Sequence, residues 1–141
     1  MKIALLGAGR IGQLHGQLVA EQPGVDGVIV NDVDAARAKV VADAVGGTVA
    51  PTPEAAVAAA DAVLIAASTH VHAALAELAI DAGVPVFVEK PLAFDLDQTV
   101  ALVAKAEQAG AVVQVGFQRR CDPAYVEAKR LLDSGELGTL Y

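Results

Sequence analysis

The chain opens with MKIALLGAGRIG, residues 1–12, and this stretch decides the fold. An apolar run from Ile3 to Leu6 leads directly into three glycines with G-x-G-x-x-G spacing: Gly7, Gly9 and Gly12. The spacing suits a buried strand that turns sharply into a helix, because the glycines allow the turn, the approach of a pyrophosphate and close helix packing. The helix N-terminus then offers free N–H groups to an anion. The stretch predicts a dinucleotide site; the alternative is a glycine-rich turn without a ligand.

An acidic residue follows at the distance that this motif requires. Asp32 lies 20 residues after Gly12, at the end of a second apolar run. We expect its carboxylate to bind the adenosine ribose hydroxyls and to repel a 2′-phosphate, which favours NAD and makes NADP the lesser candidate. Arg37 would soften that preference, and an ordinary loop acid is the alternative for Asp32. Arg10 and Ile11, inside the turn, are predicted to contact the same cofactor.

The composition fits one globular domain. The chain has 141 residues, 55% of them hydrophobic and 4% aromatic, which suits close packing of helices on a sheet. Its net charge of −7 argues against nucleic acid or an anionic membrane as a partner. One cysteine, Cys121, permits no intramolecular disulfide and fits a reducing compartment. With no signal peptide or membrane-spanning run, we expect a cytoplasmic protein, and the histidine spacing predicts no metal site.

Apolar runs alternate with helical patterns along the chain, which predicts parallel β-α-β units. The expected strands are 3–6, 27–31, 48–50, 62–67, 84–88 and 111–115, and the expected helices are 10–21, 34–45, 53–60, 71–81, 95–108 and 122–132. The first helix carries Ile11, Leu14 and Leu18 on one apolar face. Together these elements predict an α/β fold: a doubly wound parallel sheet of the Rossmann type, with six strands in the order 3-2-1-4-5-6 and helices on both faces.

Polar side chains follow the last three strands, and ligands of such sheets bind outside the carboxyl ends of the strands. Lys90 can hold a substrate oxygen there and stabilise the negative charge that develops during hydride transfer. A solvated lysine paired with Glu89 is the alternative. Arg119 and Arg120 are candidates to bind a substrate, or they are surface charges. The further predicted cofactor contacts at this edge are Ser68, Thr69, His72 and Glu89, although an ordinary helix histidine is the alternative for His72.

Longer stretches resemble the N-terminal domain of the glucose–fructose oxidoreductase/inositol dehydrogenase (Gfo/Idh/MocA) family. The resemblance is carried by GAGRIGQLH at 7–15, STHVHAALAELAIDAGVPVFVEKPLAFD at 68–95, VGFQRRCDP at 115–123 and SGELGTL at 134–140. It covers essentially the whole chain. The glycine motif is common to many families, whereas EKP after the fifth strand together with GFxRR after the sixth is specific.

The resemblance implies that Lys90 is the catalytic-site lysine with a cis bond to Pro91, and that Arg119 or Arg120 faces a cyclic polyol or sugar, such as an inositol. It divides the chain into a dinucleotide-binding domain, 1–135, and the start of a missing C-terminal α/β substrate domain, 136–141. That domain would supply the catalytic base, so we expect this piece to bind NAD without turnover and the full-length parent to be a homo-oligomer. A non-catalytic nucleotide-sensing module and a Rossmann-like methyltransferase are the alternatives.

Overall fold

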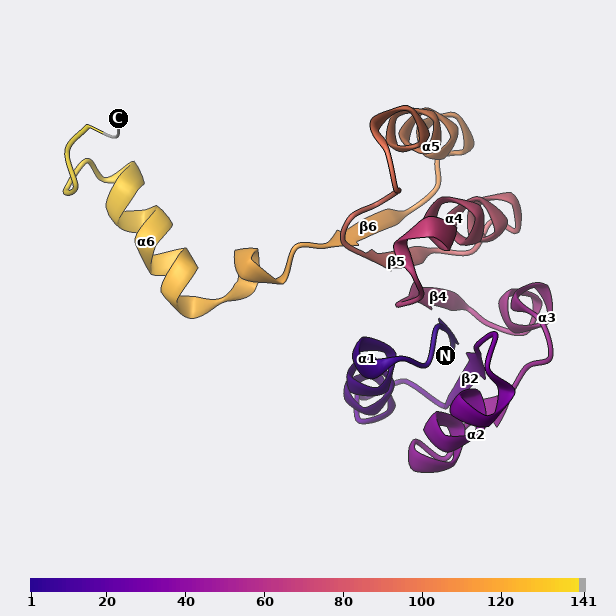
Figure 1. Ribbon diagram of the computed structural model, residues 1–141. Coiled ribbons are helices and arrows are strands. Elements are labelled where there is room, and N and C mark those ends of the chain that lie inside the picture. The colour runs from indigo at the N-terminus through magenta and orange to yellow at the C-terminus, as the bar shows by residue number, and fades with distance from the viewer. Residues whose placement is uncertain (140–141) are drawn as a thin grey trace.

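A computed structural model describes residues 1–139, and its centre is a six-stranded sheet (Figure 1). The strands are β1 (Lys2–Leu6), β2 (Gly27–Asn31), β3 (Thr48–Val49), β4 (Ala62–Ile65), β5 (Val86–Glu89) and β6 (Val113–Gly116). The helices are α1 (Arg10–Ala20), α2 (Ala35–Ala44), α3 (Pro53–Ala58), α4 (His72–Asp81), α5 (Leu96–Ala109) and α6 (Pro123–Asp133), with short 3-10 helices η1 (Thr69–Val71) and η2 (Gln118–Cys121). Every strand pair is parallel, and the order β3-β2-β1-β4-β5-β6 confirms the predicted topology.

Helices cover both faces of the sheet, as predicted for a doubly wound fold (Figure 1). Successive residues of a strand point to opposite faces, so Leu6 joins the cluster beneath α3, α4 and α5, while Leu5 joins the cluster beneath α1 and α2. Leu102 of α5, Ile65 of β4 and Val88 of β5 are fully buried in the first cluster. None of the helices within residues 1–139 has the length and apolar character needed to cross a membrane.

Two strands begin later than the sequence predicts, because the preceding helices end in a glycine motif. Gly83 and Gly110 adopt positive φ angles of 68° and 61° after α4 and α5. The next residue then donates its N–H back into the helix. Val84 donates to the carbonyl of Ala79, and Ala111 donates to that of Ala106, both at 2.9 Å. These residues therefore close helices, and β5 and β6 begin two residues beyond the expected positions.

The apolar face of α1 does not pack against the sheet. Ile11, Leu14 and Leu18 are 39%, 51% and 49% exposed. The helix instead buries Gly12 and Gly16, so that its backbone lies directly against β1 and α2. Two glycines four residues apart are the sequence signal for this close approach. The glycine motif thus decided the orientation of α1, and the hydrophobic pattern did not.

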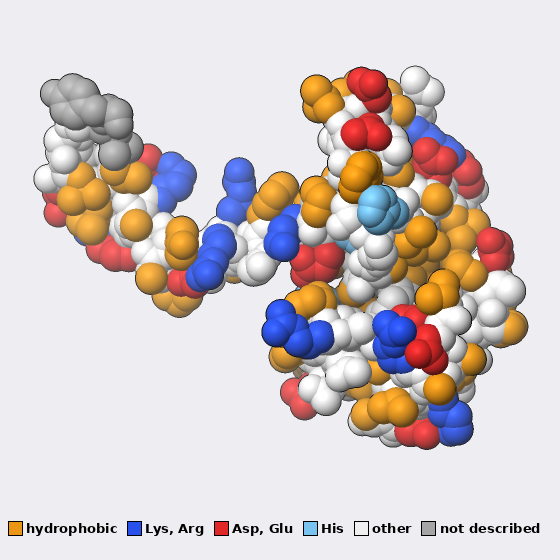
Figure 2. Space-filling model, viewed as in Figure 1, with side chains coloured by type: hydrophobic (Ala, Val, Ile, Leu, Met, Phe, Trp, Pro, Cys, Tyr) orange, Lys and Arg blue, Asp and Glu red, His pale blue; other side chains and the backbone are white. Residues whose placement is uncertain are grey.

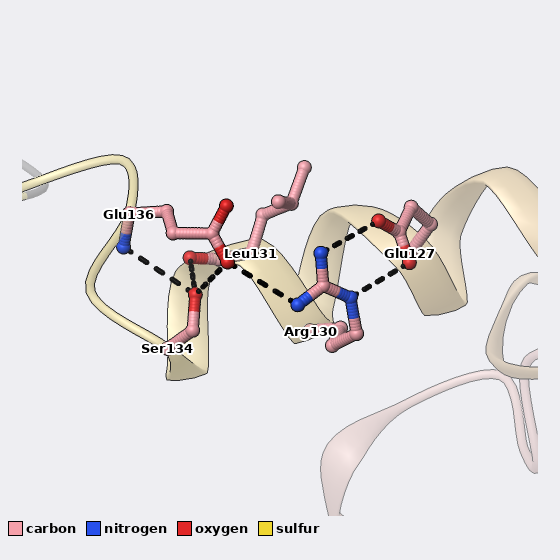
Figure 3. A network of polar contacts seen from close by, with 5 residues as sticks. All are labelled: Glu127, Arg130, Leu131, Ser134 and Glu136. Atoms are coloured by element: carbon pink, nitrogen blue, oxygen red, sulfur yellow. Dashed lines mark hydrogen bonds and ion pairs between the residues drawn. The ribbon is translucent and has the colours of Figure 1, made fainter.

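The helix α6 stands away from the sheet at the end of an arm, residues 118–139 (Figure 1). None of its side chains is buried. Lys and Arg side chains follow the arm from its junction with the rest of the molecule (Figure 2). Its polar contacts are local: Arg130 binds Glu127 and Glu136, and both carboxylates raise the pKa of Arg130 (Figure 3). Residues 138 and 139 have no regular secondary structure, and residues 140 and 141 lie outside the described residues.

Candidate functional site

The carboxyl ends of β1, β4 and β5 lie side by side at one edge of the sheet. The register sets Leu6 beside Ile65 and Ile65 beside Val88. The next residues along each strand therefore leave the sheet at the same edge: the glycine turn after β1, Ser68 and Thr69 after β4, and Lys90 after β5. We call this edge, with residues 7–12, 32, 66–70 and 89–91, the carboxyl rim.

The glycine turn is fixed by close backbone contacts. Gly7 has a φ of 102° and donates its N–H to the carbonyl of Asn31 at 2.8 Å. A Cβ on Gly7 would lie 2.5 Å from the backbone nitrogen of Ala67, and a Cβ on Gly12 would overlap the carbonyl oxygen of Gly7. A Cβ on Gly9 would meet nothing within 4 Å. Gly7 and Gly12 thus serve the fold, whereas Gly9 leaves its space open toward solvent, where a ligand can approach the backbone.

The N-terminus of α1 opens onto this space. Gly9 is its N-cap residue and has no side chain to accept a hydrogen bond from the first turn. The first N–H groups of a helix have no partner within the helix, and they carry the positive end of its dipole. Arg10 and Ile11 are exposed beside them. The turn therefore presents an uncapped, electropositive helix end, which suits a phosphate group.

Asp32 ties the second strand to the glycine turn. Its Oδ2 accepts the N–H of Ala8 at 2.7 Å, and its Oδ1 accepts the N–H of Asp34 at 2.8 Å. Each carboxylate oxygen can accept a further hydrogen bond, so a ribose hydroxyl can still bind. Arg37 lies apart from this carboxylate: its backbone and side-chain N–H groups bind Asp34 and hold the pKa of Asp34 below its usual value.

Lys90 emerges from the rim with its ammonium group unpaired among the described residues, where no carboxylate forms an ion pair with it. The peptide bond from Lys90 to Pro91 is cis, as the family resemblance implied. Lys90 is exposed, as the alternative of a solvated lysine expects, but no ion pair joins its ammonium group to Glu89. Glu89 turns its Oε1 to the Nε2 of His15 at 2.8 Å instead, and its Oε2 accepts the backbone N–H of Lys90 at 3.2 Å.

The other rim residues differ in what they can contact. Ser68 is exposed and Thr69 is half-buried, at the start of η1. His72 is only 1% exposed, and its two ring nitrogens face the carbonyl oxygens of Pro91 and Ala67 at 2.8 and 3.1 Å. We therefore correct the expectation for His72: a buried ring that already meets two backbone carbonyls supports the rim from behind and has no surface for a cofactor.

Arg119 and Arg120 lie outside the rim, on η2 at the base of the arm. Both are exposed. Arg119 pairs with Asp122 at 3.1 Å and lies over the ring of Tyr125, 5.0 Å from its centroid. Within residues 1–139, no hydrogen bond or ion pair joins either arginine to the glycine turn or to Lys90. The described residues likewise contain no group of three metal-ligating side chains placed to hold a metal ion.

Sequence reasoning gave no role to His15, which the structure brings to the site. It lies on α1, three residues after Gly12, with a ring 21% exposed and its edge against Phe87 of β5. Its place at the site depends on the orientation of α1, which the close contacts of Gly12 and Gly16 set and which the residue spacing does not reveal.

Residues 1–117 match a family model described as an oxidoreductase family with an NAD-binding Rossmann fold. The chain is 39% identical to the scyllo-inositol 2-dehydrogenase (NAD(+)) of Bacillus subtilis, over 98% of this chain and 42% of that protein. It thus spans less than half the length of such relatives.

Solved structures give the same picture. Scyllo-inositol dehydrogenase from Lactobacillus casei, with bound NAD(H) and scyllo-inositol, is 30% identical and has a TM-score of 0.90 over 98% of this chain and 42% of that one. The UDP-N-acetylglucosamine 3-dehydrogenase of Acidithiobacillus ferrooxidans is 33% identical, with a TM-score of 0.83 over 92% of this chain and 41% of that one. The chain therefore shares its fold, over about two fifths of their length, with two enzymes that are named for different substrates.

Proposed function

This chain belongs to the Gfo/Idh/MocA oxidoreductase family, and we propose that it is the NAD-binding part of a dehydrogenase that oxidises a secondary alcohol of a cyclic polyol or sugar. One observation carries the proposal: the glycine turn leaves β1 and Lys90 leaves β5 at the same rim of one parallel sheet, with only β4 between the two strands. A dinucleotide with its phosphates on α1 then extends toward the lysine. The family match favours this hypothesis over a methyltransferase.

The residues present fit NAD. The uncapped N-terminus of α1 and the open space at Gly9 would receive the pyrophosphate. Asp32 would bind the ribose hydroxyls, and its negative charge would exclude a 2′-phosphate, since Arg37 is directed to Asp34 and does not offset it. Ser68, Thr69 and the Glu89 segment would line the path toward the nicotinamide. When bound, NAD supplies the hydride acceptor.

Lys90 would act on the substrate oxygen. Its ammonium group, free of any carboxylate partner within residues 1–139, would donate a hydrogen bond to the reacting hydroxyl and stabilise the negative charge that develops on that oxygen. The proton itself requires a base. We place that base, together with most of the substrate pocket, in a C-terminal α/β domain of the parent that begins at residues 136–141. The piece 1–141 would accordingly bind NAD without turnover.

The substrate class rests on the relatives. Their names include an inositol and a nucleotide sugar, which share a ring with a secondary hydroxyl group. Arg119 or Arg120 would bind such a substrate through donors that suit hydroxyl and anionic groups. We also propose a cytoplasmic, homo-oligomeric parent.

Replacing Lys90 tests the proposal in the full-length parent. We expect Lys90→Ala to lower kcat/KM for a polyol by about three powers of ten, because the charge on the reacting oxygen loses its stabilisation. Steady-state kinetics measures this, and calorimetry should give an unchanged NAD affinity. Turnover that Lys90→Ala leaves unchanged would remove the lysine from the reaction. A wild-type parent that binds NAD but oxidises no inositol or sugar would instead favour a nucleotide-sensing module.

A further inference from the structure

Two histidines flank the segment Glu89-Lys90-Pro91, one on each side of the lysine. His15 approaches from α1 and contacts Glu89; His72 approaches from the start of α4 and contacts Pro91. Neither side chain has a part in the chemistry proposed above. His72 is buried and His15 is partly buried, and polar groups withdrawn from solvent require specific hydrogen-bond partners.

The contact of His15 links the phosphate-binding helix to the lysine. Its Nε2 lies 2.8 Å from Oε1 of Glu89, in a pair whose side chains are 21% and 16% exposed. The second oxygen of the same carboxylate accepts the backbone N–H of Lys90 at 3.2 Å. One carboxylate therefore spans from α1 to the backbone of Lys90. The ring of Phe87, 5.7 Å away at an angle of 65°, packs against His15 and limits its rotation.

The contact of His72 links the other side of the lysine to the glycine turn. Its Nδ1 lies 2.8 Å from the carbonyl oxygen of Pro91, and its Nε2 lies 3.1 Å from that of Ala67. The backbone of Ala67 in turn lies against Gly7, so closely that a Cβ on Gly7 could not be accommodated. His72 therefore connects the segment of Lys90 to the glycine turn, as His15 connects it to α1.

We propose that His15 and His72 are positioning residues, which together fix the backbone of Lys90 relative to the glycine turn. The inference rests on the proposed function, since it assigns the two histidines to the same hydride-transfer site. A lysine side chain has four flexible methylene groups, so its ammonium group reaches a defined point only if its backbone is held. Displacement of a catalytic group by about 1 Å can cost about a hundredfold in rate. The contacts of His15 and His72, which we call the histidine bracket, thus supply preorganisation that the flexible lysine side chain lacks.

A purely structural role for the histidines makes a different prediction. A histidine that only satisfies buried polar groups would change the free energy of unfolding, while the folded fraction would keep its full kcat. A positioning residue changes kcat per folded molecule, and a conservative variant that keeps the hydrogen bond restores it. His15 is the better residue to replace, because its partly exposed ring tolerates substitution more easily than the buried ring of His72.

The first arm of the test uses the full-length parent with the variants His15→Leu and His15→Gln. Leu keeps the apolar contact with Phe87 and loses the hydrogen bond, whereas the Gln amide can still donate to Glu89. We expect His15→Leu to lower kcat for polyol oxidation at least about tenfold, with KM for NAD within about twofold, and His15→Gln to recover most of the loss. A folded His15→Leu enzyme with the wild-type kcat would overturn the proposal.

The second arm uses the 141-residue chain and does not depend on turnover. Backbone ¹⁵N relaxation reports the mobility of the Lys90 amide. We expect its order parameter to fall from about 0.85, typical of rigid backbone, toward about 0.6 in His15→Leu and in His72→Phe, while that of Val88 in β5 stays constant. An order parameter of the Lys90 amide that stays at the wild-type value in both variants would overturn the positioning role of the histidines. If the wild-type parent oxidises no polyol while both variants of the 141-residue chain lose order at Lys90, the proposed function is refuted and the positioning of the Lys90 backbone by the histidines stands.

Discussion

The body of the molecule, residues 1–117, and the arm, residues 118–139, are each stabilised by a different kind of interaction. The body encloses apolar clusters on both faces of its sheet, and its site residues are attached to strands with fixed register. The arm buries no side chain of α6 and relies on surface ion pairs such as Lys129 with Asp133. Exposed ion pairs contribute little to stability.

This difference bears directly on function. The groups proposed to hold NAD lie on the body, where packing fixes their positions before any ligand binds. Arg119 and Arg120, proposed for the substrate, lie at the base of the arm, where the side chain of Arg119 contacts Asp122 and Tyr125, its neighbours in sequence. The proposed cofactor half of the site is therefore built within this chain, whereas the proposed substrate half would need contacts that the described residues do not supply.

The largest effect is expected from Gly12→Ala in the body. The added Cβ would overlap the carbonyl oxygen of Gly7, and the sheet prevents that backbone from moving. We expect the free energy of unfolding to fall by more than about 3 kcal/mol, which exceeds the gain of about 1 kcal/mol in helix propensity. Urea denaturation followed by circular dichroism measures this.

Gly9→Ala is the matched control. Gly9 has a φ of −69°, which alanine adopts without strain, and its Cβ would point into open space. Stability should stay within about 0.5 kcal/mol of the wild type, while the affinity for NAD falls at least about tenfold, because the methyl group occupies the approach of the pyrophosphate. Equal destabilisation by both substitutions would contradict the division of roles between these glycines.

An intermediate effect on stability is expected from leucine-to-alanine substitutions, one in the body and one in the arm. Leu102 of α5 is 1% exposed, and Leu102→Ala should lower the free energy of unfolding by about 3 kcal/mol through lost burial and a residual cavity. Leu132 of α6 is 37% exposed and packs on no part of the sheet, so Leu132→Ala should leave the unfolding of the body unchanged. Denaturant midpoints of the two variants give the comparison. A comparable loss in Leu132→Ala would mean that the arm folds cooperatively with the body.

The smallest effect concerns two helix caps with the same chemistry. Asp95 accepts the N–H of Gln98 at 2.8 Å at the start of α5, and Asp122 accepts the N–H of Ala124 at 3.0 Å at the start of α6. Asp95→Ala should lower the free energy of unfolding by about 1 kcal/mol, and Asp95→Asn should retain most of it. Asp122→Ala should reduce the helical circular dichroism signal and leave the denaturation midpoint in place. A shift of the midpoint in Asp122→Ala would be the contrary result.

The sequence was sufficient for the fold because its signals are local and agree with one another. Apolar runs, caps such as Asp95 and stop glycines such as Gly110 indicate the order of elements along the chain, and the glycine motif indicates the Rossmann pattern from which the strand order follows. Strand starts were missed at β5 and β6, where a helix-closing motif occupies residues that are also apolar. On α1, the close contacts of Gly12 and Gly16 outweigh the hydrophobicity of Leu14 and Leu18, which stay about half exposed.

The site was predictable only as far as it follows from strand ends. Gly9, Asp32 and Lys90 could be placed at one rim because parallel strands bring their carboxyl ends together. The partners of those groups could not be predicted, since a hydrogen bond such as that of His15 to Glu89 joins residues 74 positions apart through the rotation of a helix. The burial of His72 depends in the same way on packing, which its sequence neighbours do not reveal.

Titration of NAD into the ¹⁵N-labelled chain tests the central claim most directly, because every amide of body and arm reports at once. A dinucleotide that lies along the carboxyl rim should give saturable shifts at Gly9, Gly12, Asp32 and Lys90, with the amides of α6 unchanged. Spectra of a folded chain that do not change with NAD, or shifts at the glycine turn that never reach Lys90, would contradict the account.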